Sequence, residues 1–383
     1  MEFRSREDAT REVQRRSAML LTELPPPYGG LSVHSERLRA MLERHGWQVE
    51  VAISPPRLPP GAGRFRAFVE LGFYFARILR TPCTLVHDHF STYSIGNRGL
   101  AVVALHVILL LSLRLRRVPW VVSCGNGFLP DLLDGLPPWL RALYRWLYAG
   151  ASFAIAKNER ILAAFESLGL GSRAQVIGTF LEPTRGLSGR PLSVELECYL
   201  VAHPVCAISA GFRFEPLYHL DQVVRAVAYV RKAAPQRGIA GNVGLIVLAS
   251  HAEDPVGKSS FDVAVAETGL AGDVMVLRDI DNALDVVVRA SVFVRATDVD
   301  GDANTVKEAM MLGVPVLATD LPGRPPGIDL IRRQELGSLG PRLLDTIVDR
   351  NPARIEANRK FIREDIANNT AAILAVYERM SGH

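Results

Sequence analysis

Short apolar runs alternate with amphipathic segments from one end of the chain to the other. In the first half, residues 19–22, 49–53, 84–87, 120–123, 153–156 and 175–177 form runs typical of buried strands. Between them, residues 33–44, 65–79 and 158–168 have the periodicity of amphipathic helices. This alternation predicts βαβ units, and therefore an α/β fold with a parallel, doubly wound sheet.

The pattern stops near residue 178 and then restarts. Prolines and glycines are frequent over residues 178–204, which predicts an interdomain linker at 181–204. Beyond it, strands are predicted at 205–209, 244–248, 274–277, 292–295 and 314–318, and helices at 220–233, 261–268, 305–312 and 352–380. The 383 residues therefore suit two Rossmann-like domains, over 1–180 and 205–350, followed by C-terminal helices over 351–383.

The longest apolar run extends from Leu100 to Leu113. As a helix it would be about 21 Å long, shorter than the roughly 30 Å hydrocarbon core of a bilayer. A buried helix is therefore the favoured interpretation, with membrane insertion as the alternative. Arg114, Arg116 and Arg117 follow directly, and they fit either a charged helix end or a surface that contacts anionic lipid. Arg64, Arg66, Arg77 and Arg80, on another candidate helix, are further candidates for such a surface.

Charge is distributed unevenly although the net charge is only +4. Residues 1–190 carry 24 Lys and Arg against 15 Asp and Glu, a net of +9, whereas the remainder carries 20 against 25, a net of −5. The basic half lacks the interleaved aromatic residues of a nucleic-acid groove, so we expect no nucleic-acid partner. A membrane surface or an anionic acceptor is the functional interpretation, and simple solubility is the alternative.

The four cysteines and the N-terminus bear on the compartment. Cys83, Cys124, Cys198 and Cys206 are scattered and form no CxxC pair, which favours a reducing compartment over a disulfide framework or zinc site. The first seventeen residues are polar, and they lack the apolar core of a secretory signal. We expect a cytoplasmic protein, with a peripheral position on the inner face of the membrane as a further option.

The most informative segment covers residues 300–320. A predicted strand ends near Arg295, and a Gly-containing loop then leads into a helix at about Thr305. Loop amides and a helix N-terminus suit an anion, while Asp300 and Glu308 offer carboxylates to the hydroxyl groups of a sugar or ribose. An ordinary helix–strand unit with a solvated Glu308 is the alternative.

Asp298, Asp300 and Asp302 alternate, which raises the question of a metal site. In a calcium-binding EF-hand loop that starts at Asp298, glycine and glutamate would stand where Ala303 and Ala309 are, so this possibility fails. A divalent Asp-x-Asp site suits the two-domain organisation poorly, and we expect no catalytic metal and no cofactor.

Two further loops follow predicted strands. Gly29 and Gly30 stand at a strand-to-helix turn, where glycine lets the backbone approach a ligand closely, although such a pair is often only a turn. The second loop, over residues 209–220, contains Arg213 and Tyr218.

Together these segments resemble the retaining GT-B glycosyltransferases of family 4. The resemblance implies that Asp300, in place of the commoner Glu, contacts the donor sugar and that Glu308 holds the nucleotide ribose. It implies that Gly29, Gly30 and Arg213 serve the diphosphate, and that Tyr218 stands where the family has a second, lysine cation. Lys258 and Arg324 are candidates to compensate for that lysine.

The resemblance also defines a donor site, an acceptor side and a reaction. The remaining predicted donor-site residues are Gly301, Asp302, Ala303, Asn304 and Thr305. His87, His89 and Asn126 are the predicted acceptor-side residues, and Asp300, Arg213 and Asn126 the predicted catalytic residues. The first domain would face the acceptor, the second would bind the nucleotide sugar, and the C-terminal helices would pack back on the first domain.

The implied reaction moves a sugar from a nucleoside diphosphate sugar to a hydroxyl of a saccharide or lipid-linked acceptor, in polysaccharide or glycolipid assembly, with retention and without a covalent nucleophile. Two alternatives stay open: a nucleotide-sugar epimerase of similar fold, and a noncatalytic subunit that binds sugar nucleotides.

Overall fold

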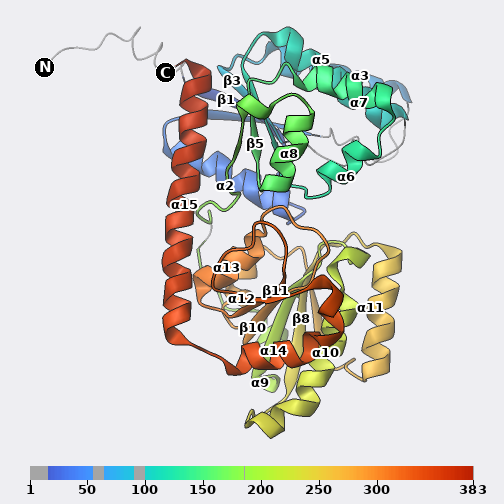
Figure 1. Cartoon of the computed structure of the whole chain (residues 1–383), viewed down its shortest axis with the longest axis vertical. Coiled ribbons are helices and arrows are strands. Elements are labelled where there is room, and N and C mark those ends of the chain that lie inside the picture. Colours follow the sequence, from blue (N-terminus) through green and yellow to red (C-terminus); the bar gives the residue numbers. More distant parts are fainter. Residues whose placement is uncertain (1–15, 55–63, 90–99, 185, 383) are drawn as a thin grey trace, which may run out of the picture. The chain divides into compact units, whose positions relative to one another are not determined.

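The computed structural model describes residues 16–54, 64–89, 100–184 and 186–382. Contacts divide the chain into two compact units (Figure 1). Unit 1 comprises Met1–Pro25, Leu31–Glu182 and Ala367–His383, and unit 2 comprises Pro26–Gly30 and Pro183–Ile366. The polar N-terminal segment up to residue 15 lies outside the described residues, as do the side chains of Arg64 and Arg66.

Unit 1 contains a six-stranded parallel sheet with the strand order β2-β1-β3-β4-β5-β6. Its strands are β1 (Ser17–Thr22), β2 (Gln48–Ile53), β3 (Leu85–His89), β4 (Trp120–Cys124), β5 (Phe153–Ala156) and β6 (Ala174–Val176). The central strands are buried along their length, because helices cover both faces of the sheet. Each strand was predicted within two residues at either end, and the parallel, doubly wound sheet is confirmed.

Helices cover the two faces of this sheet with different sets of side chains. The helices are α2 (Gly30–Arg44), α3 (Arg64–Arg80), α5 (Leu100–Arg116), α6 (Leu129–Asp134), α7 (Pro138–Tyr148) and α8 (Glu159–Ser167). Met19 and Val86 face a core shared with α3, α5, α6, α7 and α8. Leu20 and Leu85 face the other core, where α2 packs together with the end of the C-terminal helix α15 (Pro352–Ser381). Successive strand residues therefore point to opposite cores.

The apolar run that begins at Leu100 forms α5, and Leu110 and Leu113 are buried in the first of these cores. The buried-helix interpretation is thus confirmed. Among the residues that the structure describes, no helix combines the length and apolarity needed to cross a membrane.

Unit 2 contains a second six-stranded parallel sheet, ordered β12-β11-β10-β7-β8-β9. Its strands are β7 (Val205–Ala210), β8 (Val243–Ala249), β9 (Val274–Arg278), β10 (Val292–Arg295), β11 (Val316–Thr319) and β12 (Asp329–Ile331). Its helices are α9 (Val194–Ala202), α10 (Leu220–Ala233), α11 (Pro255–Thr268), α12 (Ala283–Val287), α13 (Asn304–Leu312) and α14 (Leu339–Val348). Strand β12 and helices α12 and α14 were not predicted from the sequence.

Helix α9 lies inside the segment that was predicted as a linker. Ser193 caps it, with its hydroxyl oxygen accepting from the amide of Leu196 at 3.2 Å. The Tyr199 hydroxyl donates to the carbonyl oxygens of Leu245 at 3.0 Å and Asp273 at 2.6 Å, which attaches the helix to unit 2. Pro and Gly dominate only the first part of the segment, and Leu196, Tyr199 and Leu200 then form a buried helical stripe.

Helix α15 begins in unit 2 and ends in unit 1. In unit 2, Asp365 accepts from the ammonium group of Lys307 on α13 at 2.9 Å. In unit 1, the hydroxyl of Tyr377 lies 2.6 Å from Nδ1 of His87, and Ile373 and Val376 are buried beside it. Each half of the helix is therefore anchored by a buried or half-buried polar contact.

Candidate functional site

The predicted loop and helix after Arg295 are present in unit 2. Strand β10 ends at Arg295, a loop follows, and α13 runs from Asn304 to Leu312. Gly313, with φ +79°, ends the helix in the left-handed conformation that glycine adopts without strain. Glu308 is buried one turn into α13. The loop thus lies at the carboxyl end of β10, where open α/β sheets bind ligands.

Asp298 and Asp302 each pair with cationic groups of unit 2. One carboxylate oxygen of Asp298 lies 2.6 Å from Nε2 of His219 and 2.5 Å from Nε of Arg333. Asp302 lies 2.9 Å from Nζ of Lys307, and both side chains are buried. Each of these two aspartates is therefore paired with a different part of unit 2, and Asp300 is paired with two further side chains.

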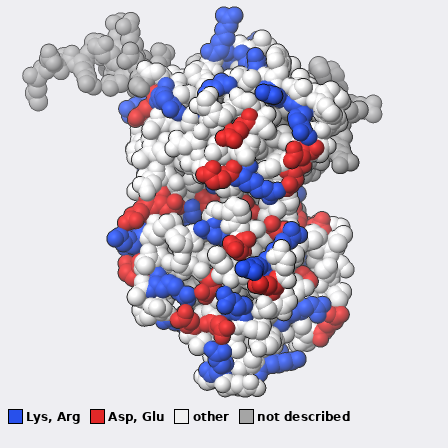
Figure 2. Space-filling model, in the orientation of Figure 1, with Lys and Arg blue, Asp and Glu red and all other residues white. Residues whose placement is uncertain are grey.

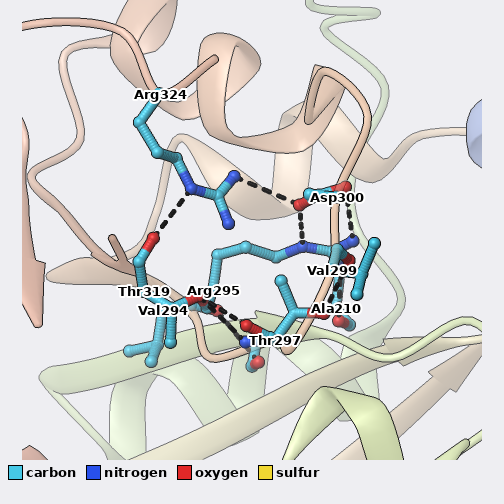
Figure 3. Close-up of polar contacts among 9 residues, drawn as sticks. Ala210, Val294, Arg295, Thr297, Val299, Asp300, Thr319 and Arg324 are labelled. Atoms are coloured by element: carbon cyan, nitrogen blue, oxygen red, sulfur yellow. Dashed lines mark hydrogen bonds and ion pairs between the residues drawn. The ribbon is translucent and has the colours of Figure 1, made fainter. Parts of the chain in front are cut away.

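Asp300 lies between two guanidinium groups (Figure 3). Arg295 donates from Nε to Oδ2 at 3.0 Å and from Nη2 to Oδ1 at 3.4 Å, and Arg324 donates from Nη1 to Oδ2 at 3.1 Å. Only 13% of the Asp300 side chain is exposed, and 12% and 5% of the two arginines. Burial acts to raise the pKa of Asp300, but attraction and hydrogen bonds from both arginines outweigh it and lower this pKa.

Backbone contacts fix the two arginines in place. Arg295 also donates from Nη1 to the carbonyl of Ala210 at 2.9 Å, and Arg324 donates from Nε to the carbonyl of Thr319 at 3.0 Å. These carbonyls end β7 and β11, the strands on either side of β10. Sequence analysis named Arg324 but missed Arg295, whose only local signal is a charged residue at the end of an apolar strand.

Tyr218 ends a short turn next to this ion-pair group. The Cζ atom of Arg295 lies 4.8 Å from the centroid of the Tyr218 ring, a cation–π geometry. The amide of Asp298 donates to the carbonyl of Leu217 at 2.9 Å, which holds the turn against the loop after β10. His219 follows in the left-handed conformation with φ +43° and precedes α10.

Arg213 lies at the start of the same loop, and its Nε is buried without a hydrogen-bond partner among the described residues. The neighbouring Phe214 approaches α11 so closely that a Cβ at Gly257 would lie 1.7 Å from the Phe214 carbonyl oxygen. Gly257 therefore fixes the path of this loop. Lys258, the next residue of α11, pairs with Asp262 at 2.5 Å.

The Gly29-Gly30 turn belongs to unit 2 by its contacts. A Cβ at Gly29 would lie 2.8 Å from Cε2 of Phe212, whereas one at Gly30 would meet nothing within 4 Å. The carbonyl of Gly30 accepts from Nδ2 of Asn304 at 3.4 Å, and the amide of Tyr28 donates to Asp279 at 3.3 Å. The turn therefore adjoins the first residue of α13.

Asp279 is a further residue that sequence analysis missed. It adopts φ +46° and accepts from both the amide and the ring Nδ1 of His251, at 2.8 and 2.5 Å. Burial acts to raise the pKa of Asp279, but the hydrogen bonds from His251 and Tyr28 outweigh it and lower this pKa. An ionised Asp279 thus joins the loops after β8 and β9 to the glycine turn.

In unit 1, His87 and His89 both lie within β3, which extends two residues beyond the end of the strand predicted at 84–87. Their rings are 4.3 Å apart, and Nδ1 of His89 lies 3.3 Å from the Ser35 hydroxyl. Both side chains are buried. Burial and the charge of Lys157 lower the pKa of His89 to about 3, and burial lowers that of His87 as well, so both rings are neutral.

Asn126 follows β4 in unit 1 and is exposed. Its side-chain oxygen accepts from the amide of Phe128 at 2.9 Å, an Asx turn that leads into α6. Asp88 lies between the two histidines in β3 but on the opposite face, and burial raises the pKa of its carboxyl to about 7. The predicted acceptor-side residues thus belong to adjacent strand ends of one sheet.

No family model matches the sequence, and no curated protein matches it either. Solved structures do match over nearly the whole chain. Sucrose-phosphate synthase from Thermosynechococcus elongatus is 15% identical, with a TM-score of 0.66 and coverage of 95% of this chain and 99% of that one.

Two further structures are similar to the same extent. A UDP-forming α,α-trehalose-phosphate synthase from Burkholderia vietnamiensis is 13% identical, with a TM-score of 0.68 and coverage of 96% and 97%. Anabaena HepE, in complex with UDP and glucose, is 14% identical, with a TM-score of 0.63 and coverage of 95% and 100%. At these identities the likeness concerns architecture, and it shows that this chain has the GT-B fold of glycosyltransferase structures.

Proposed function

We propose that the protein is a retaining glycosyltransferase that moves a sugar from a nucleoside diphosphate sugar to an acceptor hydroxyl. One observation carries this proposal. In unit 2, a loop at the carboxyl end of β10 leads into α13, with Asp300 before the helix and the buried Glu308 one turn into it. Arg295, at the end of β10, and Arg324, after β11, both donate to Asp300. Cations and carboxylates thus flank a helix N-terminus.

This arrangement matches the two chemical needs of such a donor. The departing diphosphate is an anion, and amides of residues 301–305, the helix N-terminus and a guanidinium group stabilise negative charge. The carboxylate of Glu308 would accept hydrogen bonds from the hydroxyl groups of the ribose. Arg213 and the Gly29-Gly30 turn would complete the diphosphate side, since glycine lets a backbone approach a ligand closely.

The similar structures suggest which nucleotide to test first. The Burkholderia synthase is UDP-forming and the Anabaena protein was solved with UDP and glucose. We therefore place uridine diphosphate sugars ahead of guanosine and adenosine diphosphate sugars as donors for this chain. His87, His89 and Asn126 remain the proposed acceptor side, and a saccharide or lipid-linked hydroxyl remains the proposed acceptor.

A donor screen followed by product analysis tests this proposal. We expect one nucleoside diphosphate sugar among UDP-, GDP- and ADP-glucose and their epimers to raise the melting temperature. Slow release of the free sugar without an acceptor, with its anomeric configuration retained, is the expected signature of the transferase. An isomerised nucleotide sugar would instead indicate an epimerase, binding without turnover would indicate a noncatalytic subunit, and no binding would overturn the donor site.

We further propose that unit 1 rests on an anionic membrane surface, as a cytoplasmic, peripheral protein. The structure changes which residues carry this proposal. Arg116 donates to the backbone carbonyls of Ile78 and Thr81, and Arg77 pairs with Glu50, so these two arginines are engaged within unit 1. On the face seen in Figure 2, basic and acidic side chains are also interspersed.

Exposed aromatic residues on α7 supply a more specific surface. Trp139 and Trp146 are 67% and 52% exposed, and because they are seven residues apart they share one face of the helix. The guanidinium of Arg114, on α5, stacks over the ring of Trp146 at 4.5 Å and donates from Nη1 to the Trp146 carbonyl at 2.6 Å, so it belongs to the same surface. Trp is favoured at membrane–water interfaces, and each basic residue near an anionic surface adds about 1 kcal/mol.

Vesicle co-sedimentation decides the membrane proposal. We expect the protein to sediment with vesicles of phosphatidylglycerol and phosphatidylcholine at low salt, and not with phosphatidylcholine alone. Trp139→Ser with Trp146→Ser should abolish binding at unchanged net charge. Val194→Ser with Val201→Ser is the matched control, since these two exposed residues are also seven apart, on α9 of unit 2. If the protein does not sediment with anionic vesicles, the membrane proposal fails and the glycosyltransferase proposal is unaffected.

A further inference from the structure

We propose that Arg324 is the second cation for the donor diphosphate, and that Asp300 acts as the buried counter-ion that holds Arg324 in place. This inference rests on the proposed function and deepens it. It addresses a specific departure from the family, since Tyr218 stands where the family has a lysine. Four observations within unit 2 support it.

The first observation concerns the donors of Arg324. Its Nε donates to Thr319 and its Nη1 to Asp300, but its Nη2 is buried and has no hydrogen-bond partner among the described residues. A guanidinium nitrogen of this kind carries two N–H groups. Buried donors without a partner are rare, because leaving them unpaired costs free energy. An anionic oxygen of the ligand is the partner that these groups lack.

The second observation favours Arg324 over Arg295 as that cation. Each nitrogen atom of Arg295 already donates within the protein, Nε and Nη2 to Asp300 and Nη1 to Ala210. Its guanidinium also lies over the ring of Tyr218. Arg295 therefore orders the carboxylate of Asp300, while Arg324 retains donors for a ligand (Figure 3).

The third observation is that Lys258, the other candidate from the sequence, already pairs with a carboxylate of its own helix. Both carboxylate oxygens of Asp262 lie close to its ammonium group, at 2.6 and 2.5 Å, one helical turn further along α11. The same ammonium group lies 5.7 Å from the centroid of the Phe214 ring. The contacts of Lys258 are thus with α11 and with the neighbouring loop at Phe214.

The fourth observation is the position of Asp300. It directly precedes the loop whose amides lead into α13, and its Oδ2 accepts from both arginines. A carboxylate in this place keeps Arg324 beside the helix N-terminus, where an anion is favoured. Because Nη2 itself is buried, the loop of Arg324, whose Pro322 and Gly323 are exposed, must shift slightly when the anion enters.

Calorimetry with matched nucleotides tests the inference. The probes are whichever of UDP, GDP and ADP gives the largest thermal shift with the native protein, together with its monophosphate and its nucleoside. We expect Arg324→Gln to weaken diphosphate binding by roughly 10- to 100-fold, the loss of a hydrogen bond to a charged group, and nucleoside binding by less than about threefold. The control Arg342→Gln removes an arginine of α14 that donates to the Leu330 carbonyl of β12, and it should change neither affinity.

Two further variants separate ligand contact from folding. Arg324→Lys keeps the charge beside Asp300 but loses the second donor nitrogen, so it should fold and still bind the diphosphate weakly. Asp300→Asn should also weaken the diphosphate, and its effect should largely disappear when Arg324 is already Gln, because Asp300 acts through Arg324.

Three results would overturn the inference. Unchanged diphosphate affinity in both Arg324 variants would show that Arg324 does not contact the ligand. Equal losses for diphosphate, monophosphate and nucleoside would show a purely structural role. If the native protein bound none of the three diphosphates, the proposed function itself would fail, and the inference with it.

Discussion

Arg295 lies over the aromatic ring of Tyr218, with its Cζ 4.8 Å from the ring centroid, while the same guanidinium holds Asp300. Burial raises the pKa of Tyr218, although Arg295 opposes this shift, so the phenol is neutral. A neutral ring is therefore the neighbour that Arg295 requires. At position 218, where the resemblance places a lysine, this chain therefore has an aromatic residue that contacts the cation of Arg295.

The first prediction follows from this contact. Tyr218→Lys should destabilise unit 2 by about 2–4 kcal/mol, because it buries an ammonium group beside Arg295 and removes a cation–π contact. Tyr218→Phe keeps the ring and should cost less than about 1 kcal/mol. Urea unfolding followed by circular dichroism measures both. Equal stability of the two variants would mean that the charge of Arg295 does not restrict position 218.

Glu308 provides the second prediction. Glu308→Gln should weaken binding of the best nucleoside diphosphate by about 1 kcal/mol, because a hydrogen bond to a charged acceptor becomes a neutral one. Calorimetry with the ribonucleotide and its 2′,3′-dideoxy analogue tests the role directly. Both proteins should lose affinity for the dideoxy analogue, but the loss should be clearly smaller for the variant, whose amide still bonds a hydroxyl more weakly. An equal loss for the native protein and the variant would exclude Glu308 as the ribose acceptor.

The glycine turn gives a third prediction, which separates two adjacent positions. Gly30→Ala should fold normally, since its Cβ would meet no atom within 4 Å, but should lower diphosphate affinity by about tenfold because it obstructs close backbone approach. Gly29→Ala should instead lower the melting temperature, because its Cβ would clash with the ring of Phe212. Normal nucleotide affinity in Gly30→Ala would place the diphosphate elsewhere.

The fold was predictable where the sequence signal is local. The run Val292–Arg295 and the helix Leu220–Ala233 were predicted with their observed bounds, because buried strands and amphipathic helices have periods visible in a short window. Helix α9 was missed because prolines and glycines before it dominated the interpretation of the segment. The edge strand β12 was missed because it begins with Asp329 and follows Pro325, Pro326 and Gly327, so the segment shows no uninterrupted apolar run.

In the candidate site, too, only the local features were predictable. Asp300 and Glu308 lie on one loop and helix, so their spacing was visible in the sequence. The pairing of Asp300 with Arg295 and Arg324 joins residues up to 24 positions apart, and only the order of the strands brings them together. The burial of His87 and His89 was also unpredictable, because it depends on α2 and on α15 from the far end of the chain.

Asp88 offers the last prediction, which concerns the pH dependence of stability. Its Oδ2 is buried without a hydrogen-bond partner among the described residues, and burial raises the pKa of the carboxyl from 3.8 to about 7. Tyr74, Cys124 and Tyr148 are titratable groups with which it interacts. Burial raises the pKa of Tyr74 and of Cys124 to about 12, and it also raises that of Tyr148 well above its usual value. None of these groups titrates below pH 8, so Asp88 titrates independently of them.

The sign of the effect follows from linkage. Between about pH 4 and pH 7 the folded protein retains the proton of Asp88, whereas the unfolded chain has lost it, so stability must fall as the pH rises through this range. Between pH 5 and pH 8 the loss should be about 2–3 kcal/mol. Asp88→Asn, whose amide resembles the neutral acid in shape, should remove this loss.

All four tryptophans lie in unit 1, as Asp88 does, so tryptophan fluorescence during urea unfolding reports on the relevant unit. The native protein and the variant share their other titrating groups, which cancel when their stabilities are subtracted at each pH. A difference that stays constant from pH 5 to pH 8 would show that Asp88 is ionised throughout in the folded protein, and that water or a cationic group reaches its buried oxygen.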